Sequence, residues 1–588
     1  MKGFFNHVLA SMLGTFLVLI LIGIINIFIF IAVLSSSGAF SEESAKISEN
    51  TILKIDFKEP VEDRMSVKPN LNTMRFAKTL GLKDINDALK KAKNDDRIKG
   101  IYLDFSFINI GIASAEEIRN SLKDFKRSGK FIIAHSDFYT HKSYYLASVA
   151  DKIYLTPNGV VQFTGLSAQL LFFKSLLEKT GIEPEIIRHG KFKSAVEPFM
   201  SDEMSKENRE QTERYLSSLW NTMLTEIASQ RGISVSVLNK YANELAVRNA
   251  GSAKKLNLVD NLKYEDEVIA ELKENAGIPK DKKLKTVSLS EYINSGENID
   301  NVLRSDKDNI AVIYATGEIV DGEGTEEQIG SKTLAKAIRS AREDKNVKAI
   351  VLRINSPGGS ALASEVIWRE TVLAKKEKPF IVSMGDVAAS GGYYIACEAD
   401  TIVAEPNTLT GSIGVFGIFF NAKELLSDIG VTINAVNTNT YSDMGNPGRK
   451  MSDYERGVIQ QSVEDIYTTF ITHVGKGRNL SVDSVDAIGQ GRVWSGEDAL
   501  KIGLVDVLGG LQTAIDIASE KAEIKEFGIK YYPEKDKFLI LLENTFSETK
   551  KSVIKEELGK AYGYYQNIKN IKEINGIQAR MPYYLEIK

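Results

Sequence analysis

The clearest potential for chemistry lies in the stretch VSMGDVAASGGYYIACEAD, which runs from Val382 to Asp400. Ser390 stands there between a run of small residues and a Gly-Gly pair, where a strand is expected to end and a helix to begin. Such a turn can expose a serine as a nucleophile. It is also an ordinary place for a helix N-cap, so the stretch alone leaves both interpretations open.

A second candidate is the segment RINSPGGS, from Arg353 to Ser360, which directly follows an expected strand. Its glycines let a substrate approach closely spaced backbone N–H groups, which is the form of an oxyanion hole. Pro-Gly-Gly is also a common turn sequence. The serine-bearing stretch one strand later favours the oxyanion hole.

Both segments belong to the second copy of an internal repeat with a spacing of 249 residues. The sequence IKGIYLDFS at Ile98 parallels VKAIVLRIN at Val347, and SYYLASVADKIYLTPN at Ser143 parallels GYYIACEADTIVAEPN at Gly392. In each copy, short apolar β-rich runs alternate with helical stretches. This alternation predicts an α/β fold with mostly parallel sheets in two tandem repeats.

The repeat divides the chain into five parts. They are an N-terminal membrane anchor and linker (1–49), the first repeat (50–265), a charged connector (266–307), the second repeat (308–515) and a C-terminal tail (516–588), to which we assign no chemistry.

The N-terminal part contains 27 consecutive uncharged residues, from Val8 to Leu34. A helix of that length spans about 40 Å, enough for the roughly 30 Å hydrocarbon core of a bilayer. The run is longer than the apolar region of a cleaved signal peptide, so we expect an uncleaved transmembrane helix. Lys2 before the run, with Glu42 and Glu43 after it, favours a cytoplasmic N-terminus, with everything after about residue 40 outside.

The amino-acid composition limits the kinds of partner, cross-link and metal site that the chain can have. A formal net charge of −4 gives no global reason to expect nucleic acid as a partner. The single cysteine, Cys397, excludes an intramolecular disulfide. Since no Cys/His cluster has zinc spacing, no structural metal is expected.

Four motifs together resemble the signal peptide peptidase A (protease IV) family in its long, duplicated form. They are SPGG at Ser356, GDVAASGGYY at Gly385, GSIGV at Gly411 and GKFKSAVEPF at Gly190. The resemblance covers nearly the whole chain. It implies a ClpP/crotonase-type fold for each repeat and a Ser/Lys dyad.

By this resemblance, Ser390 is the nucleophile, Lys193 the general base and Ser412 the residue that orients the lysine, while the amides of Gly359 and Gly391 form the oxyanion hole. The family implies a single-pass serine endopeptidase of the bacterial inner membrane, with its catalytic part on the periplasmic side. It hydrolyses remnant signal peptides and other apolar peptides through an acyl-enzyme. No cofactor is implied, and a homotetramer is expected.

The repeat provides an internal test of these roles. Position 390 corresponds to His141 in the first copy, whereas Lys193 corresponds to Ser442 in the second. The first copy therefore has the base without the nucleophile, and the second copy has the reverse. Because only a combination of the two copies is complete, we predict a site that spans an interface between repeats, within one chain or between neighbours.

A lysine base must lose its proton near neutral pH, although its ordinary pKa is about 10.4. Burial disfavours the charged form and lowers this pKa. The apolar residues Phe192, Val196 and Phe199 flank Lys193 and predict such surroundings. The neighbouring Lys191 is the less favoured base in the same motif.

Several alternatives remain. His189 or His473 is the candidate base of a Ser-His-Asp triad, although packing roles are favoured for both. Asp386 is mirrored by Asp137 in the copy without the nucleophile, which favours a structural role. A crotonase-like enzyme that binds acyl-thioesters and an inactive membrane ring scaffold are the other function classes. The intact serine, lysine and SPGG set argues against the scaffold.

Overall fold

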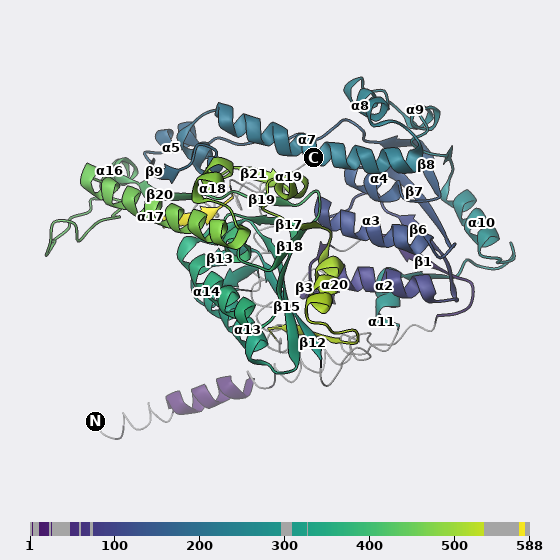
Figure 1. The fold of residues 1–588 in the computed structure, drawn as a ribbon, viewed down its shortest axis with the longest axis horizontal. Coiled ribbons are helices and arrows are strands. Elements are labelled where there is room, and N and C mark those ends of the chain that lie inside the picture. The colour runs from purple at the N-terminus through teal and green to yellow at the C-terminus, as the bar shows by residue number, and fades with distance from the viewer. Residues whose placement is uncertain are drawn as a thin grey trace.

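The computed structural model describes residues 3, 11–22, 25, 47–57, 60–70, 75–295, 308–325, 327–533 and 576–581. Within them lie two large sheets, one for each repeat, and a third sheet that joins the repeats. Helices cover the sheets (Figure 1). The prediction of an α/β fold with mostly parallel sheets is confirmed.

The first large sheet has six strands, and every neighbouring pair in it is parallel. Their order is β10 (Asn261–Leu262), β8 (Lys152–Val161), β7 (Phe131–Tyr139), β6 (Ile98–Asp104), β1 (Thr51–Ile55) and β11 (Thr286–Ser288). Alternation of these strands with helices produces the parallel arrangement, since a parallel pair needs a crossover connection.

The second large sheet has eight strands. Its main path is β21 (Val493–Ser495), β19 (Leu409–Gly411), β17 (Phe380–Ala389), β15 (Val347–Ser356), β12 (Asn309–Thr316) and β23 (Gly528–Tyr532), while β18 (Thr401–Ala404) pairs with β17 and β22 (Val507–Leu508) with β18. Only the β19–β21 pair is antiparallel among the described pairs of this sheet.

The two repeats follow one plan. Helix α2 (Leu82–Asn94) and helix α13 (Ser331–Glu343) have the same length and stand 249 residues apart. Each directly precedes an equivalent central strand in the chain, β6 in the first repeat and β15 in the second. The spacing found in the sequence is therefore also the spacing of the structural elements.

The third sheet collects strands from distant parts of the chain. Its order is β14 (Gln328–Gly330), β13 (Glu318–Val320), β16 (Gly358–Ser360), β24 (Gly576–Arg580), β20 (Val415–Asn421) and β9 (Glu183–His189). Strand β9 comes from the first repeat and pairs antiparallel with β20 of the second. This sheet is therefore the place where a residue of one repeat can reach a site in the other.

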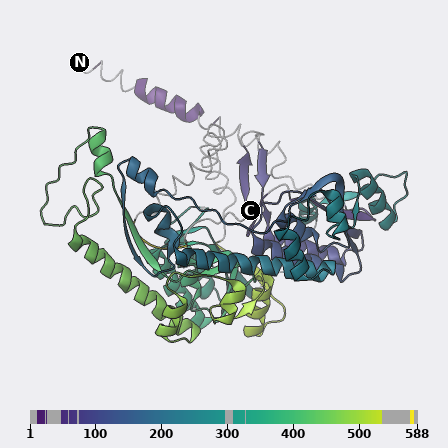
Figure 2. The same cartoon turned by 90° about the horizontal axis from the view of Figure 1, so that it is seen from above.

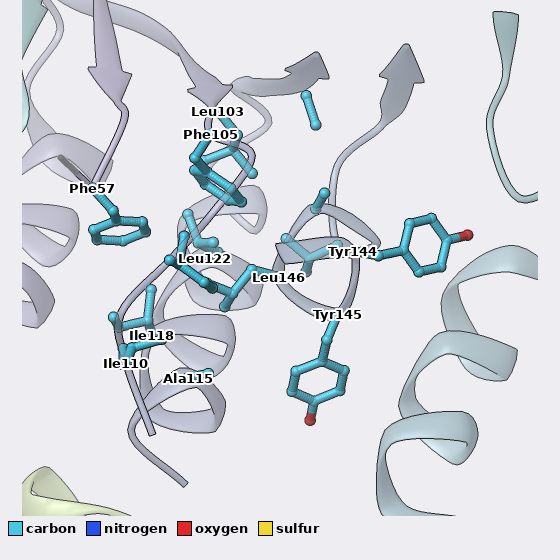
Figure 3. Packing of buried hydrophobic residues seen from close by; sticks show 14 of the residues in the cluster. Phe57, Leu103, Phe105, Ile110, Ala115, Ile118, Leu122, Tyr144, Tyr145 and Leu146 are labelled. Carbon is cyan, nitrogen blue, oxygen red and sulfur yellow. The ribbon is translucent and has the colours of Figure 1, made fainter. Parts of the chain in front are cut away.

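The core of the first repeat is built mainly from aliphatic and aromatic side chains of its sheet and helices. The ring of Phe57 lies 5.4 Å from that of Phe105, and Leu146 points toward Leu122 of α3 (Ile112–Lys126) (Figure 3). The same cluster includes Ala389, Leu409 and Val493 of the second repeat, so the two repeats share buried surface.

Buried charges also join the repeats. The guanidinium of Arg353 on β15 lies 2.8 Å from Asp63 and 2.7 Å from Glu117, and its side chain is fully buried. Asp386 accepts hydrogen bonds from the backbone N–H and the hydroxyl of Ser114, at 3.1 Å and 2.6 Å. Removing one partner of the buried Arg353 set leaves an uncompensated charge, so these ion pairs fix how the repeats dock.

Two long helices lie near the third sheet, and the one in the second repeat packs against β9 and β20. Helix α7 (Lys206–Arg231) runs from the side of β9 to the first repeat, and α17 (Asp453–Arg478) is its counterpart in the second (Figure 1). The segment between α16 (Lys423–Asp428) and α17 projects away from the body in both views (Figures 1 and 2).

Most of the predicted anchor from Val8 to Leu34 lies outside the described residues. Its described residues 11–22 are helical and exposed. The described part of the chain contains no helix with the length and hydropathy needed to span a membrane.

Candidate active site

Ser390 lies at the turn between β17 and α15 (Gly391–Ala396), as the sequence predicts. Its backbone has φ 54° and ψ −114°, a conformation that residues with a side chain rarely adopt. Although Ser390 holds the N-cap position, its side chain makes no cap hydrogen bond. The Ser390 hydroxyl therefore does not serve as a helix cap.

Small neighbours make the turn sterically feasible. A Cβ atom at Gly391 would lie 2.7 Å from the Ser364 hydroxyl, and one at Gly392 would lie 2.8 Å from the Ser356 carbonyl oxygen. The Gly-Gly pair after Ser390 is therefore required by close packing.

Lys193 reaches this turn from the first repeat. It follows β9, whose last residue His189 pairs with Val415 at the start of β20. The Lys193 Nζ lies 2.8 Å from Ser390 Oγ. It also lies 3.0 Å from the carbonyl oxygen and 3.1 Å from the hydroxyl of Ser412. The lysine, the nucleophile candidate and its supporting serine thus meet within one chain.

The surroundings favour a neutral amine. Lys193, Ser390 and Ser412 are each 0% exposed. Burial lowers the pKa of Lys193 well below its usual range. A neutral amine has two N–H donors and one lone pair. The two N–H groups match the two acceptor oxygens of Ser412, and the lone pair matches the O–H of Ser390.

Two residues that support the lysine were missed by sequence reasoning. The side chain of Gln211 on α7 donates to the Phe192 carbonyl at 3.0 Å and to the Ser194 hydroxyl at 2.8 Å, and accepts from the Val493 N–H at 3.1 Å. It therefore fixes both neighbours of Lys193. A lone glutamine on a helix carries no sequence signal for this role.

The second missed residue is Gly491, which has φ +82°. A Cβ atom there would lie 2.6 Å from the N, Cα and Cβ atoms of Lys193. Only glycine combines this backbone conformation with so close an approach. It lies about 300 residues from the lysine in sequence, so no local pattern points to it.

The SPGG loop lies next to Ser390. Gly358 and Gly359 have φ of +98° and +157°. A Cβ atom at Gly358 would lie 2.7 Å from the backbone nitrogen of Gly391. The backbone of the SPGG loop and the N–H of Gly391 therefore face the same small region, as an oxyanion hole requires.

The described histidines make their contacts elsewhere. His189 hydrogen-bonds to Glu464 at 2.5 Å and stacks on Tyr467. His473 stacks on Trp368, with ring centroids 3.5 Å apart. Neither is among the hydrogen-bond partners that the structure gives Ser390.

The first repeat has no equivalent centre in the described residues. His141, which occupies the position equivalent to Ser390, accepts a hydrogen bond from the Thr164 N–H at 3.0 Å. Burial lowers its pKa to about 4, so it stays neutral. Ser442, equivalent to Lys193, is exposed and bonds to Asn439. The complementary loss inferred from the repeat is thus seen in the positions of these side chains.

Comparison with known proteins shows that the chain is similar to peptidases of one family. The family model described as "Peptidase family S49" matches residues 124–279 and 373–525. "Protease 4" of Haemophilus influenzae is 33% identical over 93% of this chain and 92% of its own length. "Protease 4" of Salmonella typhi is 38% identical over 81% and 77%, and "Serine protease SPPA, chloroplastic" of Arabidopsis thaliana is 36% identical over 82% and 70%.

Solved structures that are similar to part of this chain include two point mutants of proteases. A point mutant of ClpP1 from Listeria monocytogenes has 14% identity, covers 35% of this chain and 94% of its own, and gives a TM-score of 0.24. A point mutant of the 1510-N membrane-bound stomatin-specific protease has 16% identity, covers 39% and 99%, and gives a TM-score of 0.26.

Proposed function

The chain belongs to peptidase family S49 and is a serine protease, and we propose that it is a membrane-anchored endopeptidase in which Ser390 attacks the peptide bond and Lys193 is the general base. The observation that carries this proposal is the 2.8 Å hydrogen bond between Lys193 Nζ and Ser390 Oγ. Both side chains are fully buried and come from different repeats.

The proposed reaction proceeds in two stages. The neutral amine of Lys193 takes the hydroxyl proton while Ser390 Oγ bonds to the carbonyl carbon of the substrate. The peptide C–N bond then breaks, and the new amine leaves with the proton from Lys193. In the second stage a water molecule gives one proton to Lys193 and its oxygen bonds to the ester carbon. The bond from this carbon to Ser390 Oγ then breaks, and Oγ takes the proton back from Lys193, which releases the acid and restores both residues.

Negative charge on the carbonyl oxygen has to be stabilised in both stages. We assign this task to the backbone amides of Gly359 and Gly391. Support comes from the approach of the SPGG loop to the Gly391 nitrogen. Removal of one such donor in serine proteases costs about 100- to 1000-fold in kcat.

Ser412 is proposed to orient the lysine. Its carbonyl and hydroxyl oxygens are the two acceptors that a neutral amine needs while its lone pair faces Ser390. The backbone of Ser412 has φ 51°, and its N–H donates to the Arg492 carbonyl at 2.7 Å. The residue is therefore held in an uncommon conformation that presents both oxygens to one atom.

The substrates we propose are remnant signal peptides and other apolar peptides in the bilayer. The uncharged run from Val8 to Leu34 supports a single-pass anchor in the bacterial inner membrane, with the catalytic part on the periplasmic side. An anchored enzyme would meet apolar peptides at the membrane surface, where they concentrate.

A homo-oligomer, and a tetramer by family resemblance, is also proposed. Strand β9 pairs with β20 within the chain. The segment equivalent to β9 in the second repeat is 432–438, and the segment equivalent to β20 in the first repeat is 166–172. Both lie outside strands, and exposed apolar side chains such as Val436 and Leu171 lie in them. We propose that segment 432–438 of one copy pairs with 166–172 of the next, a head-to-tail contact of the kind that forms a ring when its rotation closes. Val436→Asp is expected to yield monomers in analytical ultracentrifugation.

The experiment that tests the proposed activity uses the full chain in detergent with a synthetic signal peptide as substrate. Wild type is expected to cleave it, while Ser390→Ala and Lys193→Met are each expected to lose at least about 100-fold in kcat. Arg353→Lys is not a suitable control because it disturbs the buried ion pairs, so the exposed Ser442→Ala serves instead. Retained activity in Lys193→Met would refute the assignment of the base.

A further inference from the structure

Loop 489–492, which precedes β21 in the second repeat, lies between two segments of the candidate site. On one side, the Gln490 carbonyl accepts the Phe192 N–H at 2.9 Å, next to the lysine. On the other side, the Arg492 carbonyl accepts the Ser412 N–H at 2.7 Å. The loop therefore determines how the lysine segment of the first repeat and the Ser412 segment of the second lie relative to each other.

The side chain of Arg492 folds back over the lysine segment. Its guanidinium carbon lies 4.6 Å from the ring centroid of Phe192 and 4.6 Å from that of Trp494. A planar, weakly hydrated guanidinium is suited to such a position against aromatic rings. Its Nε atom is buried and has no hydrogen-bond partner among the described residues, so ring contacts hold this part of the group.

Both rings lead to the proposed dyad. Phe192 is buried and directly precedes Lys193. The Trp494 ring packs on Gly411, where a Cβ atom would lie 2.8 Å from it, and the Gly411 carbonyl accepts the Ser390 N–H at 2.7 Å. One guanidinium thus connects the neighbour of the lysine with the turn that carries the serine.

An ion pair orients this guanidinium. Arg492 Nη2 lies 2.9 Å from Glu210 Oε1 on α7, next to Gln211, which binds the Phe192 carbonyl. The Glu210 side chain is 54% exposed, whereas that of Arg492 is only 19% exposed. Because an exposed ion pair contributes little stability by itself, its main effect is to fix the plane of the guanidinium over the ring.

We infer that Arg492 is a positioning residue for the proposed reaction: its guanidinium covers Phe192 and so keeps water from Lys193, while its backbone holds Ser412 in place. This inference rests on the proposed function, since it concerns the same lysine base. Arg492 has no contact with the Ser390 hydroxyl among the described hydrogen bonds, so it acts through its two neighbours.

The cover matters because burial is what keeps the amine neutral. The charged and titratable groups packed around the lysine segment come from β9 and the segment after it, from α7 and α17, and from loop 489–492: Arg188, His189, Lys191, Glu197, Glu210, Glu464 and Arg492. Burial nevertheless is the cause that lowers the pKa of Lys193. Admission of water would therefore return this pKa toward its ordinary value.

The test compares two arginines that join α7 to the second repeat. Arg492→Ala removes the cover. Arg214→Ala is the matched control, because Arg214 donates two hydrogen bonds of 2.8 Å to Asp498 but does not stack on Phe192 in the described structure. Both variants lose one ion pair between the repeats, and only the first also loses the ring contacts.

The first readout is the pH profile of kcat in detergent with a synthetic signal peptide. Arg492→Ala should lose at least about tenfold at pH 7 and approach wild type near pH 10, because each unit of pKa above the pH lowers the neutral fraction of the amine tenfold. Arg492→Lys keeps a cation for Glu210 but lacks the planar group, so it should resemble Arg492→Ala. Arg214→Ala should keep the profile of wild type.

Three results would overturn the inference. A loss in Arg492→Ala that persists near pH 10 would show that the residue does not act through the protonation of Lys193. A wild-type profile in Arg492→Lys would show that the charge suffices without the stack. An equal shift in Arg214→Ala would show that docking of the repeats, rather than the cover, sets the profile.

A second readout does not depend on activity and so separates this inference from the proposed function. In the Ser390→Ala background, acetic anhydride labels amines, and peptide mass spectrometry gives the rate at Lys193 relative to the exposed Lys206. Addition of Arg492→Ala should raise this relative rate near pH 10 and move its midpoint to higher pH. An unchanged rate and midpoint would overturn the cover even if wild type cleaves the peptide, whereas the expected changes in a chain that cleaves nothing would refute only the function.

Discussion

Gly491 offers the sharpest test of how the lysine is positioned. A methyl group at this residue would lie 2.6 Å from three atoms of Lys193, whereas carbon atoms normally approach to about 3.5 Å. The Gly491→Ala variant therefore has to displace the Lys193 backbone by about 1 Å. The Lys193 Nζ–Ser390 Oγ distance of 2.8 Å would then exceed the limit of a hydrogen bond.

The expected loss follows from this displacement. A misplacement of about 1 Å at a reacting group costs about 100-fold in rate, or about 2.7 kcal/mol in activation free energy. A positive φ in a residue with a Cβ costs roughly a further 1–2 kcal/mol of folding stability. Gly491→Ala should therefore lose both activity and some thermal stability.

Gly503 is the matched control. Its φ of +78° is close to the +82° of Gly491, but no atom lies within 4 Å of a Cβ atom placed there. Gly503→Ala thus incurs the same backbone cost without the contact to Lys193. Gly503→Ala should have a lower Tm than wild type but the same kcat/KM on a signal peptide. Equal activity of the two variants would refute the positioning argument.

Three further predictions concern the dyad. Ser412→Ala removes the hydroxyl acceptor 3.1 Å from Lys193 Nζ but leaves the carbonyl oxygen at 3.0 Å, so kcat should fall about tenfold, the value of one hydrogen bond. A loss as large as that of Lys193→Met would contradict this prediction. Because burial lowers the pKa of Lys193 and only the neutral amine can accept a proton, activity should rise with pH through a pKa well below that of free lysine; a rise only near pH 10 would contradict it. The unfolded chain binds this proton up to about pH 10.4 and the folded chain does not, so burial of Lys193 lowers the stability of the folded chain below that pH. Lys193→Met should therefore have a higher Tm than wild type at pH 7, and the difference should shrink as the pH approaches 10. A lower Tm of the variant at pH 7 would contradict this prediction.

Much of the arrangement follows from the repeat alone. Position 390 and its equivalent His141, together with Lys193 and its equivalent Ser442, imply a site that needs both copies, and the side chains meet accordingly. Alternating apolar runs likewise predict the parallel sheets. These features depend on residue type and periodicity, which a sequence displays directly.

Other features depend on contacts between distant segments. Gly491 and Gln211 matter because of what packs against them, and neither lies in a motif. Strand β24 is short and shows no distinctive pattern, and its place between β16 and β20 is set by tertiary pairing. The roles of Ser390 and Lys193, the anchor and the substrates stay predictions that only activity and localisation measurements test.

The most direct test of the central claim is a mixing experiment with Ser390→Ala and Lys193→Met. Each variant carries its own affinity tag, so that mixed assemblies can be isolated after co-expression. Since Ser390 and Lys193 of the same chain are hydrogen-bonded at 2.8 Å, each chain with either substitution lacks a complete dyad. The account predicts that wild type alone cleaves a signal peptide and that mixed assemblies stay inactive. Activity restored in the mixed assemblies would show that the two residues meet across chains and would contradict it.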